Sequence, residues 1–251
     1  MHGGGRILAG ALAAASLLSS VEAAHAAAPG WLKRAFAGHG PASHLDAKTV
    51  ARYRIDSGGA FVLDQTALRP LLKFDDNPEV WVLTASRGPR GDMIYSSDLG
   101  RPLLRMTHMG GVTVFTRERP GGSAAAPAGA GAPLRLVSIG PAGLYRTLLQ
   151  ASARSSRAAR HLVGFDAPDA DAASDGLIAD TATVASEAIV SLAVDGEGRA
   201  VLSHVARIEI LRGARPAAAM RGGVLGIVVT PTLGVAGRPS SQRILLAVGA
   251  R

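Results

Sequence analysis

Short apolar runs separated by turn residues, recurring about every 8–12 residues, constrain the fold of this chain most strongly. The pattern occupies residues 46–118. In its clearest part, Tyr53 and Ile55 alternate with polar neighbours before the turn Ser57-Gly58-Gly59, and the alternation resumes at Phe61. Alternation around a glycine-rich turn is typical of a β-hairpin. A series of such strands predicts an antiparallel β-rich region, folded as a sandwich or a small barrel.

Residues 119–133 have a different composition, RPGGSAAAPAGAGAP, made almost entirely of glycine, alanine and proline. Side chains of this kind bury too little apolar surface to offset the entropy lost on ordering the chain. The segment is therefore predicted to be a flexible linker or a long surface loop.

Residues 134–251 predict helices with further strands. Pro141 fits the first turn of a helix, and Asp175 fits the N-cap of a second helix whose apolar residues continue to Leu192. The run Ile244–Val248 is predicted to be a strand. The chain is therefore assigned to the α+β class. One domain shared with residues 46–118 is slightly favoured over two independent domains.

The N-terminus has the three parts of a secretory signal. Met1–Arg6 carries one arginine, Ile7–Leu18 is an uncharged run of about twelve residues, and Ala24-His25-Ala26 precedes a cleavage site before Ala27. A membrane-spanning helix needs roughly twenty apolar residues. Residues 1–26 are therefore predicted to be a cleaved signal peptide, and the mature chain is expected to hold no transmembrane segment and to be periplasmic or secreted.

Two alternatives accompany this prediction. The apolar run can stay in place as an uncleaved anchor, or cleavage can follow Ala28. Residues 27–45 are predicted to be a loosely ordered leader, with a single apolar turn around Trp31 and Phe36 as the alternative.

The amino-acid composition limits which reactions, metal sites and partners the chain can support. The chain has no cysteine, which excludes disulfides, thiolate catalysis and cysteine-based zinc sites. Its net charge is +8, but only three of the 27 basic residues are lysine, a skew typical of GC-rich coding. The charge is compatible with anionic lipid or glycan of the envelope as a partner. Aromatic residues make up 4% of the chain, so no nucleic acid is expected as a partner.

No cofactor is expected, because the sequence lacks the motifs that bind one. The chain has no Gly-Lys pair for a phosphate loop and no G-x-S-x-G nucleophile elbow. A calcium loop is a weak candidate: Asp169, Asp171, Asp175 and Asp180 take positions 1, 3, 7 and 12 of such a loop, but its central glycine and final glutamate are missing. The alternative is a solvated acidic loop that caps the following helix.

Arginines recur every three residues at Arg154, Arg157 and Arg160. On a helix they form a basic stripe, which is a candidate contact for anionic lipid or glycan. The alternative is an ordinary solvated helix face.

Four runs carry a resemblance to a known family: VWVLT (80–84), GPRGDMIY (88–95), LGRPLLR (99–105) and GGVTVFT (110–116). In these runs the chain resembles an uncharacterised family of exported alphaproteobacterial proteins, a domain of unknown function. The resemblance implies no reaction and no site residues. We expect an exported, non-enzymatic envelope accessory protein that binds or scaffolds. The alternative is a periplasmic hydrolase with a spatially assembled Ser/His/Asp or carboxylate site.

Overall fold

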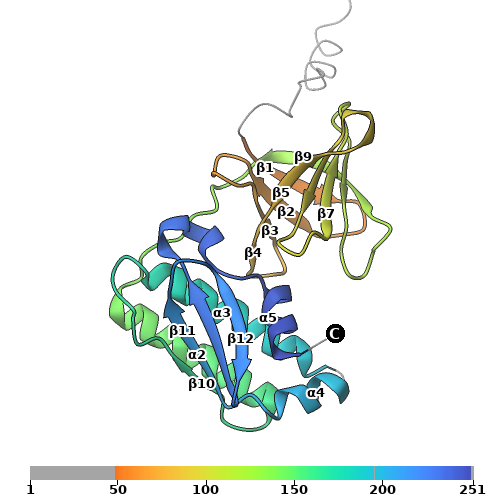
Figure 1. Cartoon of the computed structure of the whole chain (residues 1–251). Helices are drawn as coiled ribbons and strands as arrows, with labels where there is room; N and C mark the ends of the chain where they lie inside the picture. The colour runs from red at the N-terminus through yellow and green to blue at the C-terminus, as the bar shows by residue number, and fades with distance from the viewer. Residues whose placement is uncertain (1–48, 195, 250–251) are drawn as a thin grey trace, which may run out of the picture. The chain divides into compact units, whose positions relative to one another are not determined.

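The computed structural model describes residues 49–194 and 196–249. The predicted signal peptide and leader lie outside these residues. An antiparallel nine-stranded sheet is followed by helices and a four-stranded sheet (Figure 1), which confirms the predicted α+β class. Within the described ranges, no helix combines the length and apolarity needed to cross a membrane.

The first sheet has the strand order β4-β3-β2-β1-β9-β8-β7-β6-β5, and all of its neighbouring strands are antiparallel. Its strands are β1 (Val50–Ile55), β2 (Ala60–Asp64), β3 (Leu71–Phe74), β4 (Val80–Val82), β5 (Thr84–Arg87), β6 (Met93–Ser96), β7 (Pro102–Met106), β8 (Val112–Val114) and β9 (Ser123–Ala130).

Strands β4 and β5 form the two edges of this sheet, yet only Leu83 separates them in the chain. The sheet therefore curls until its edges approach each other, which gives the nearly barrel-shaped form in Figure 1. Leu83 is fully buried, and its N–H donates to the carbonyl of Pro70 at 2.8 Å. Of the two predicted forms of the β-rich region, the small barrel describes this sheet better than the sandwich.

The predicted hairpin at the start of the sheet is confirmed. Gly58 and Gly59 have φ angles of 106° and 83°, which favour glycine because it lacks a Cβ atom. Tyr53 pairs directly with Phe61 across the two strands, and their rings stack with centroids 5.1 Å apart. Phe61 is fully buried, so this cross-strand pair anchors the core of the sheet.

The prediction of a flexible linker over residues 119–133 is wrong for Ser123–Ala130, which forms β9. This strand pairs with β8 over Ser123–Ala125 and with β1 from Ala125 onward, so its backbone finds hydrogen-bond partners although its side chains are small. Ala125 is buried in the core of the sheet. Pro127 lies past the end of β8, where β9 has a neighbour on one side only, a position that tolerates proline.

The second half contains four α-helices and a mixed sheet in the order β10-β11-β13-β12 within the described residues. Strands β10, β11 and β13 are parallel, and β12 is antiparallel to β13. The elements are α2 (Gly140–Ala159), β10 (Gly164–Asp166), α3 (Asp175–Leu192), α4 (Gly196–Leu202), β11 (Arg207–Arg212), β12 (Ala217–Arg221), β13 (Val224–Val229) and α5 (Ser241–Val248).

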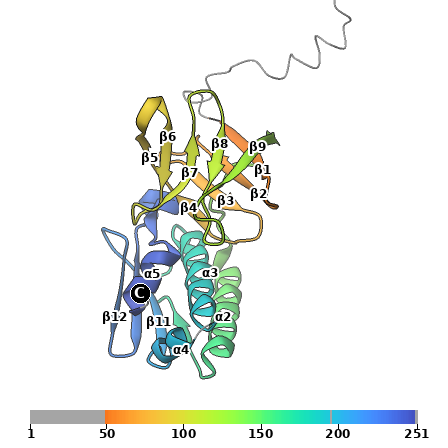
Figure 2. The same cartoon turned by 90° about the vertical axis from the view of Figure 1, so that its right-hand side faces the viewer.

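Helix α3 is the central helix of this half, as Figure 2 shows with α2 beside it. Twelve of its residues are buried, among them Ile178, Ala182 and Ile189. They belong to one core with the inward residues of β11 and β13, such as Ile208 and Ile227. The apolar stripe in the sequence therefore identified this helix correctly.

Two local predictions in this half are wrong. Ile244–Val248 lies in helix α5 instead of a strand, because Ser240 caps the helix: its hydroxyl accepts the backbone N–H of Arg243. The N-cap of α3 is Ser174, and Asp175 is the first residue of the helix.

Candidate functional site

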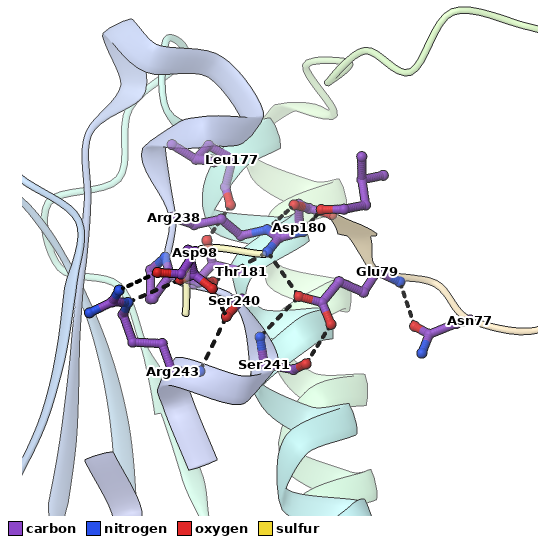
Figure 3. Close-up of polar contacts among 12 residues, drawn as sticks. Asn77, Glu79, Asp98, Leu177, Asp180, Thr181, Arg238, Ser240, Ser241 and Arg243 are labelled. Atoms are coloured by element: carbon purple, nitrogen blue, oxygen red, sulfur yellow. Dashed lines mark hydrogen bonds and ion pairs between the residues drawn. The ribbon is translucent and has the colours of Figure 1, made fainter. Parts of the chain in front are cut away.

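A buried cluster of charged side chains surrounds Arg238, which follows the 3-10 segment η2 (Pro231–Gly237). The Arg238 side chain is only 2% exposed. Its Nε donates to the carboxylate of Asp180 on α3, and its Nη2 donates to the carbonyl of Val80 on β4 at 2.9 Å. Its Nη1 lies 3.5 Å from Oε1 of Glu79. One guanidinium therefore joins the first sheet to α3 (Figure 3).

Glu79 is as deeply buried as Arg238, and both of its carboxylate oxygens have partners. Oε1 accepts the backbone N–H of Ser241 at 2.9 Å, and Oε2 accepts the Ser241 hydroxyl at 2.5 Å. Burial raises the pKa of Glu79 above its ordinary value, and Arg238 and Ser241 offset this only in part. Glu79 thus holds the first turn of α5 against the end of β4.

A second, less buried set of contacts lies beside this pair. The Ser240 hydroxyl donates to Oδ1 of Asp98 at 2.6 Å, and Arg243 Nε donates to Oδ2 of the same carboxylate at 3.0 Å. Nη2 of Arg243 also donates to the backbone carbonyl of Asp98 at 3.0 Å. Asp98 lies in the turn between β6 and β7, so α5 is attached to the first sheet at two separate points.

A pocket of about 270 Å³ opens at this junction. Its lining includes Arg69, Arg238 and Arg243 together with Glu79, Asp98 and Ser240.

Arg69 differs from the other two arginines of the pocket. Its Nη2 donates to the Thr84 hydroxyl at 2.6 Å and its Nε to the Leu83 carbonyl at 3.4 Å. Across residues 49–194 and 196–249, no carboxylate forms an ion pair with it, whereas Arg238 and Arg243 both have such partners. The pocket therefore carries one positive charge that its own lining does not neutralise.

The carboxylates that line the pocket are held by hydrogen bonds. Here Glu79 and Asp98 each accept two hydrogen bonds from serine and arginine groups, and Asp180 is held by Arg238. These contacts fix the lining carboxylates in position.

Among residues 49–194 and 196–249, no serine, histidine and aspartate side chains are joined by hydrogen bonds as a triad. The hydrolase alternative stays a prediction. The nearest approach of a histidine to a carboxylate in these ranges is His108 Nδ1 to Asp92 Oδ1, at 3.9 Å. No serine hydroxyl of the described chain is hydrogen-bonded to this pair. Both ring nitrogens of His161 face backbone carbonyls instead, those of Ala159 and Val205.

The four aspartates of the calcium candidate have separate surroundings. Asp171 accepts hydrogen bonds from Ser174 and pairs with Arg212, while Asp169 and Arg212 line a shallow surface hollow. Asp180 belongs to the Arg238 cluster described above. Nowhere in the described chain do three His, Asp or Glu side chains gather as a metal site.

Asp175 serves the start of another helix. Its carboxylate accepts the Ser138 hydroxyl at 2.8 Å and the backbone N–H groups of Ile139 and Gly140 at 3.1 and 2.7 Å. These bonds, the one from Ser138 foremost, hold the pKa of Asp175 below its ordinary value. Asp175 therefore caps the start of α2, whereas Ser174, the N-cap residue of α3, forms no side-chain capping bond.

The predicted arginine stripe lies on α2, but its members differ. Arg154 pairs with Glu187 on α3. Arg157 is exposed and donates from Nε to the carbonyl of Ala153 at 3.2 Å. Arg160 is the C-cap of α2, with a left-handed φ of 60°. The structure thus leaves Arg157 and Arg160 facing solvent and uses Arg154 within the fold.

Sequence reasoning missed the Arg238 cluster. In the sequence, Asp98 has only the features of a turn residue, and Glu79 and Arg238 belong to no motif. The usable signal is local: Ser240 and Ser241 precede an apolar pattern at helical spacing, which indicates a capped helix. The partners of that helix lie in strands and turns more than 140 residues earlier.

A family model described as a domain of unknown function (DUF4908) matches residues 32–248. No curated protein and no solved structure matches the chain.

Proposed function

Because the chain belongs to this family of unknown function, we propose a function from its own geometry: an exported accessory protein of the bacterial envelope that binds a small carboxylate, without catalysis, in the pocket beside Arg238. The observation that carries the proposal is the unpaired charge of Arg69 in a pocket whose other charged groups are already paired.

The ligand class follows from charge and size. Guanidinium groups bind carboxylates through two parallel hydrogen bonds, which favours them over neutral groups of the same shape. Drug-sized ligands occupy pockets of about 300–1,000 Å³. A pocket of about 270 Å³ lies just below that range and fits a single small molecule. Arg243 lies on the same lining.

Pre-organisation supports binding further. The buried ion pairs of Arg238 hold β4, α3 and the start of α5 together, so the pocket walls need little rearrangement to receive a ligand. A site that is already ordered loses less entropy on binding. Export is supported by Arg6, the apolar run Ile7–Leu18 and the small residues Ala24-His25-Ala26.

A thermal-shift titration with glucuronate and glucose tests the site, since the two sugars differ mainly in the carboxylate. Glucuronate should raise the Tm, because a ligand at one hundred times its Kd stabilises the folded state by about 2.7 kcal/mol. Glucose should have little effect. Arg69→Gln should abolish the glucuronate shift.

Arg54→Gln is the matched control, because Arg54 is an exposed arginine on β1 outside the pocket lining. Equal shifts in the two variants would contradict the assignment of Arg69, and equal shifts with the two sugars would contradict the carboxylate. A protein that responds to neither sugar would refute this ligand class.

A further inference from the structure

The outward face of α2 combines exposed apolar side chains with unpaired arginines. Leu144 and Ala151 are buried on the side that packs toward α3. Tyr145 and Leu149, one helical turn apart, are 64% and 51% exposed. Both residues therefore leave half or more of their surface available to a partner.

Positive charge flanks these two side chains. Arg146, Arg157 and Arg160 are exposed, and α2 contains no aspartate or glutamate. Glu187 neutralises only Arg154, which lies nearer to α3. At 100° per residue, Tyr145, Arg146, Leu149 and Arg157 fall within an arc of about 120°, and Arg160 follows the helix as its C-cap. The apolar and basic side chains therefore face the same direction.

We propose that this face of α2, defined by Tyr145, Arg146, Leu149 and Arg157 together with the C-cap residue Arg160, docks on the headgroups of an anionic phospholipid bilayer. Helices that bind in the membrane interface have this composition, with arginines toward the headgroups and aromatic or aliphatic side chains entering the boundary with the acyl chains. Charge complementarity selects the anionic surface, because three arginines project from a face without an acidic residue. The surface is separate from the pocket beside Arg238, so the two proposals stand or fall independently.

The size of the effect follows from the charges. One basic residue near an anionic membrane surface contributes about 1 kcal/mol, which is about a fivefold change in partition. Removal of all three arginines should therefore weaken binding roughly a hundredfold. The attraction decays over a Debye length of about 8 Å at physiological ionic strength, so added salt should also weaken it.

The test is co-sedimentation of the full chain with vesicles of phosphatidylcholine alone or mixed with phosphatidylglycerol. The unchanged chain should bind the mixed vesicles and bind the neutral ones much less. The triple change Arg146→Gln, Arg157→Gln and Arg160→Gln should lower partition into mixed vesicles about a hundredfold. The double change Tyr145→Ser and Leu149→Ser should lower it as well. Every variant carries the same N-terminus, so any contribution from that segment is shared.

A control triple removes the same charge elsewhere, at the exposed arginines Arg54, Arg101 and Arg119 of the nine-stranded half. Its binding should fall far less than that of the α2 triple. Equal losses in the two triples would overturn the proposal, since net charge alone would then explain binding. Equal binding to neutral and mixed vesicles would overturn it too, as would binding that is unaffected by the serine changes. Circular dichroism melts confirm that each variant is folded before it is compared.

Discussion

Replacement of Arg238 by methionine tests the buried cluster most directly. The change removes the cation and leaves the carboxylates of Glu79 and Asp180 facing each other, with side chains only 2% and 17% exposed. Removing one partner of a buried ion pair costs about 3–5 kcal/mol, because the remaining charge stays desolvated. For a folded part of this length, each kcal/mol lowers the Tm by about 2–4 °C. We therefore expect the Tm to fall by roughly 10 °C.

The pH dependence of this loss of stability shows whether Glu79 is the carboxylate that causes it. Burial raises the pKa of Glu79 in the folded chain above its ordinary value of 4.5. A carboxyl with a raised folded-state pKa contributes its full stabilisation below the unfolded pKa and loses it as the pH rises through the folded pKa. Without Arg238 the pKa of Glu79 rises further, so the deficit of Arg238→Met should be smaller at pH 5 than at pH 8.

Urea denaturation followed by circular dichroism measures both effects. The second change Glu79→Gln, made in the Arg238→Met chain, should recover part of the lost stability because it removes the unpaired charge. Arg54→Met is the control for loss of an exposed arginine and should change the unfolding free energy by less than about 0.5 kcal/mol. The stabilising role of the buried ion pairs would be refuted if Arg238→Met lowered the unfolding free energy no more than Arg54→Met. It would also be refuted if the loss of unfolding free energy in Arg238→Met grew as the pH fell.

Three further predictions can be checked on the same chain. Ala125→Asp should unfold the first sheet or destabilise it by about 3 kcal/mol or more, because Ala125 is buried. Ala126→Asp should be tolerated, because Ala126 lies on the exposed side of β9. Equal effects of the two changes in urea melts would contradict the placement of β9. Asp175→Asn should destabilise the chain at neutral pH. The difference in unfolding free energy from the unchanged chain should shrink as the pH falls below about 4, because a carboxylate with a lowered folded-state pKa stabilises the fold above its ordinary pKa of 3.8 and loses this contribution on protonation. A constant difference between pH 7 and pH 3 would argue against the bonds to Ser138 and its neighbours. N-terminal sequencing of the native protein should begin near Ala27, and an intact Met1 in a cytoplasmic fraction would exclude cleavage and export.

Sequence by itself determined the elements whose stability is local. The β1–β2 hairpin follows from alternation around Gly58-Gly59, and α3 follows from an apolar stripe that ends at Leu192. Both patterns specify which face of an element is buried before any partner is known. The α+β class followed from the order of these patterns along the chain.

Tertiary structure decided what depends on distant partners. β9 has a composition typical of a linker, and it is a strand because β8 pairs with its first residues and β1 with the rest. The Arg238 cluster joins residues 158 positions apart, Val80 and Arg238, and no local pattern records such a pairing. The sequence does not distinguish the arginines of α2. Only the structure shows that Glu187 pairs with Arg154, while the other arginines of α2 have no acidic neighbour on the helix. The propensity of a segment to form a helix or strand depends on residues that are neighbours in the sequence. The pairing of buried charges depends instead on which distant segments the fold brings together.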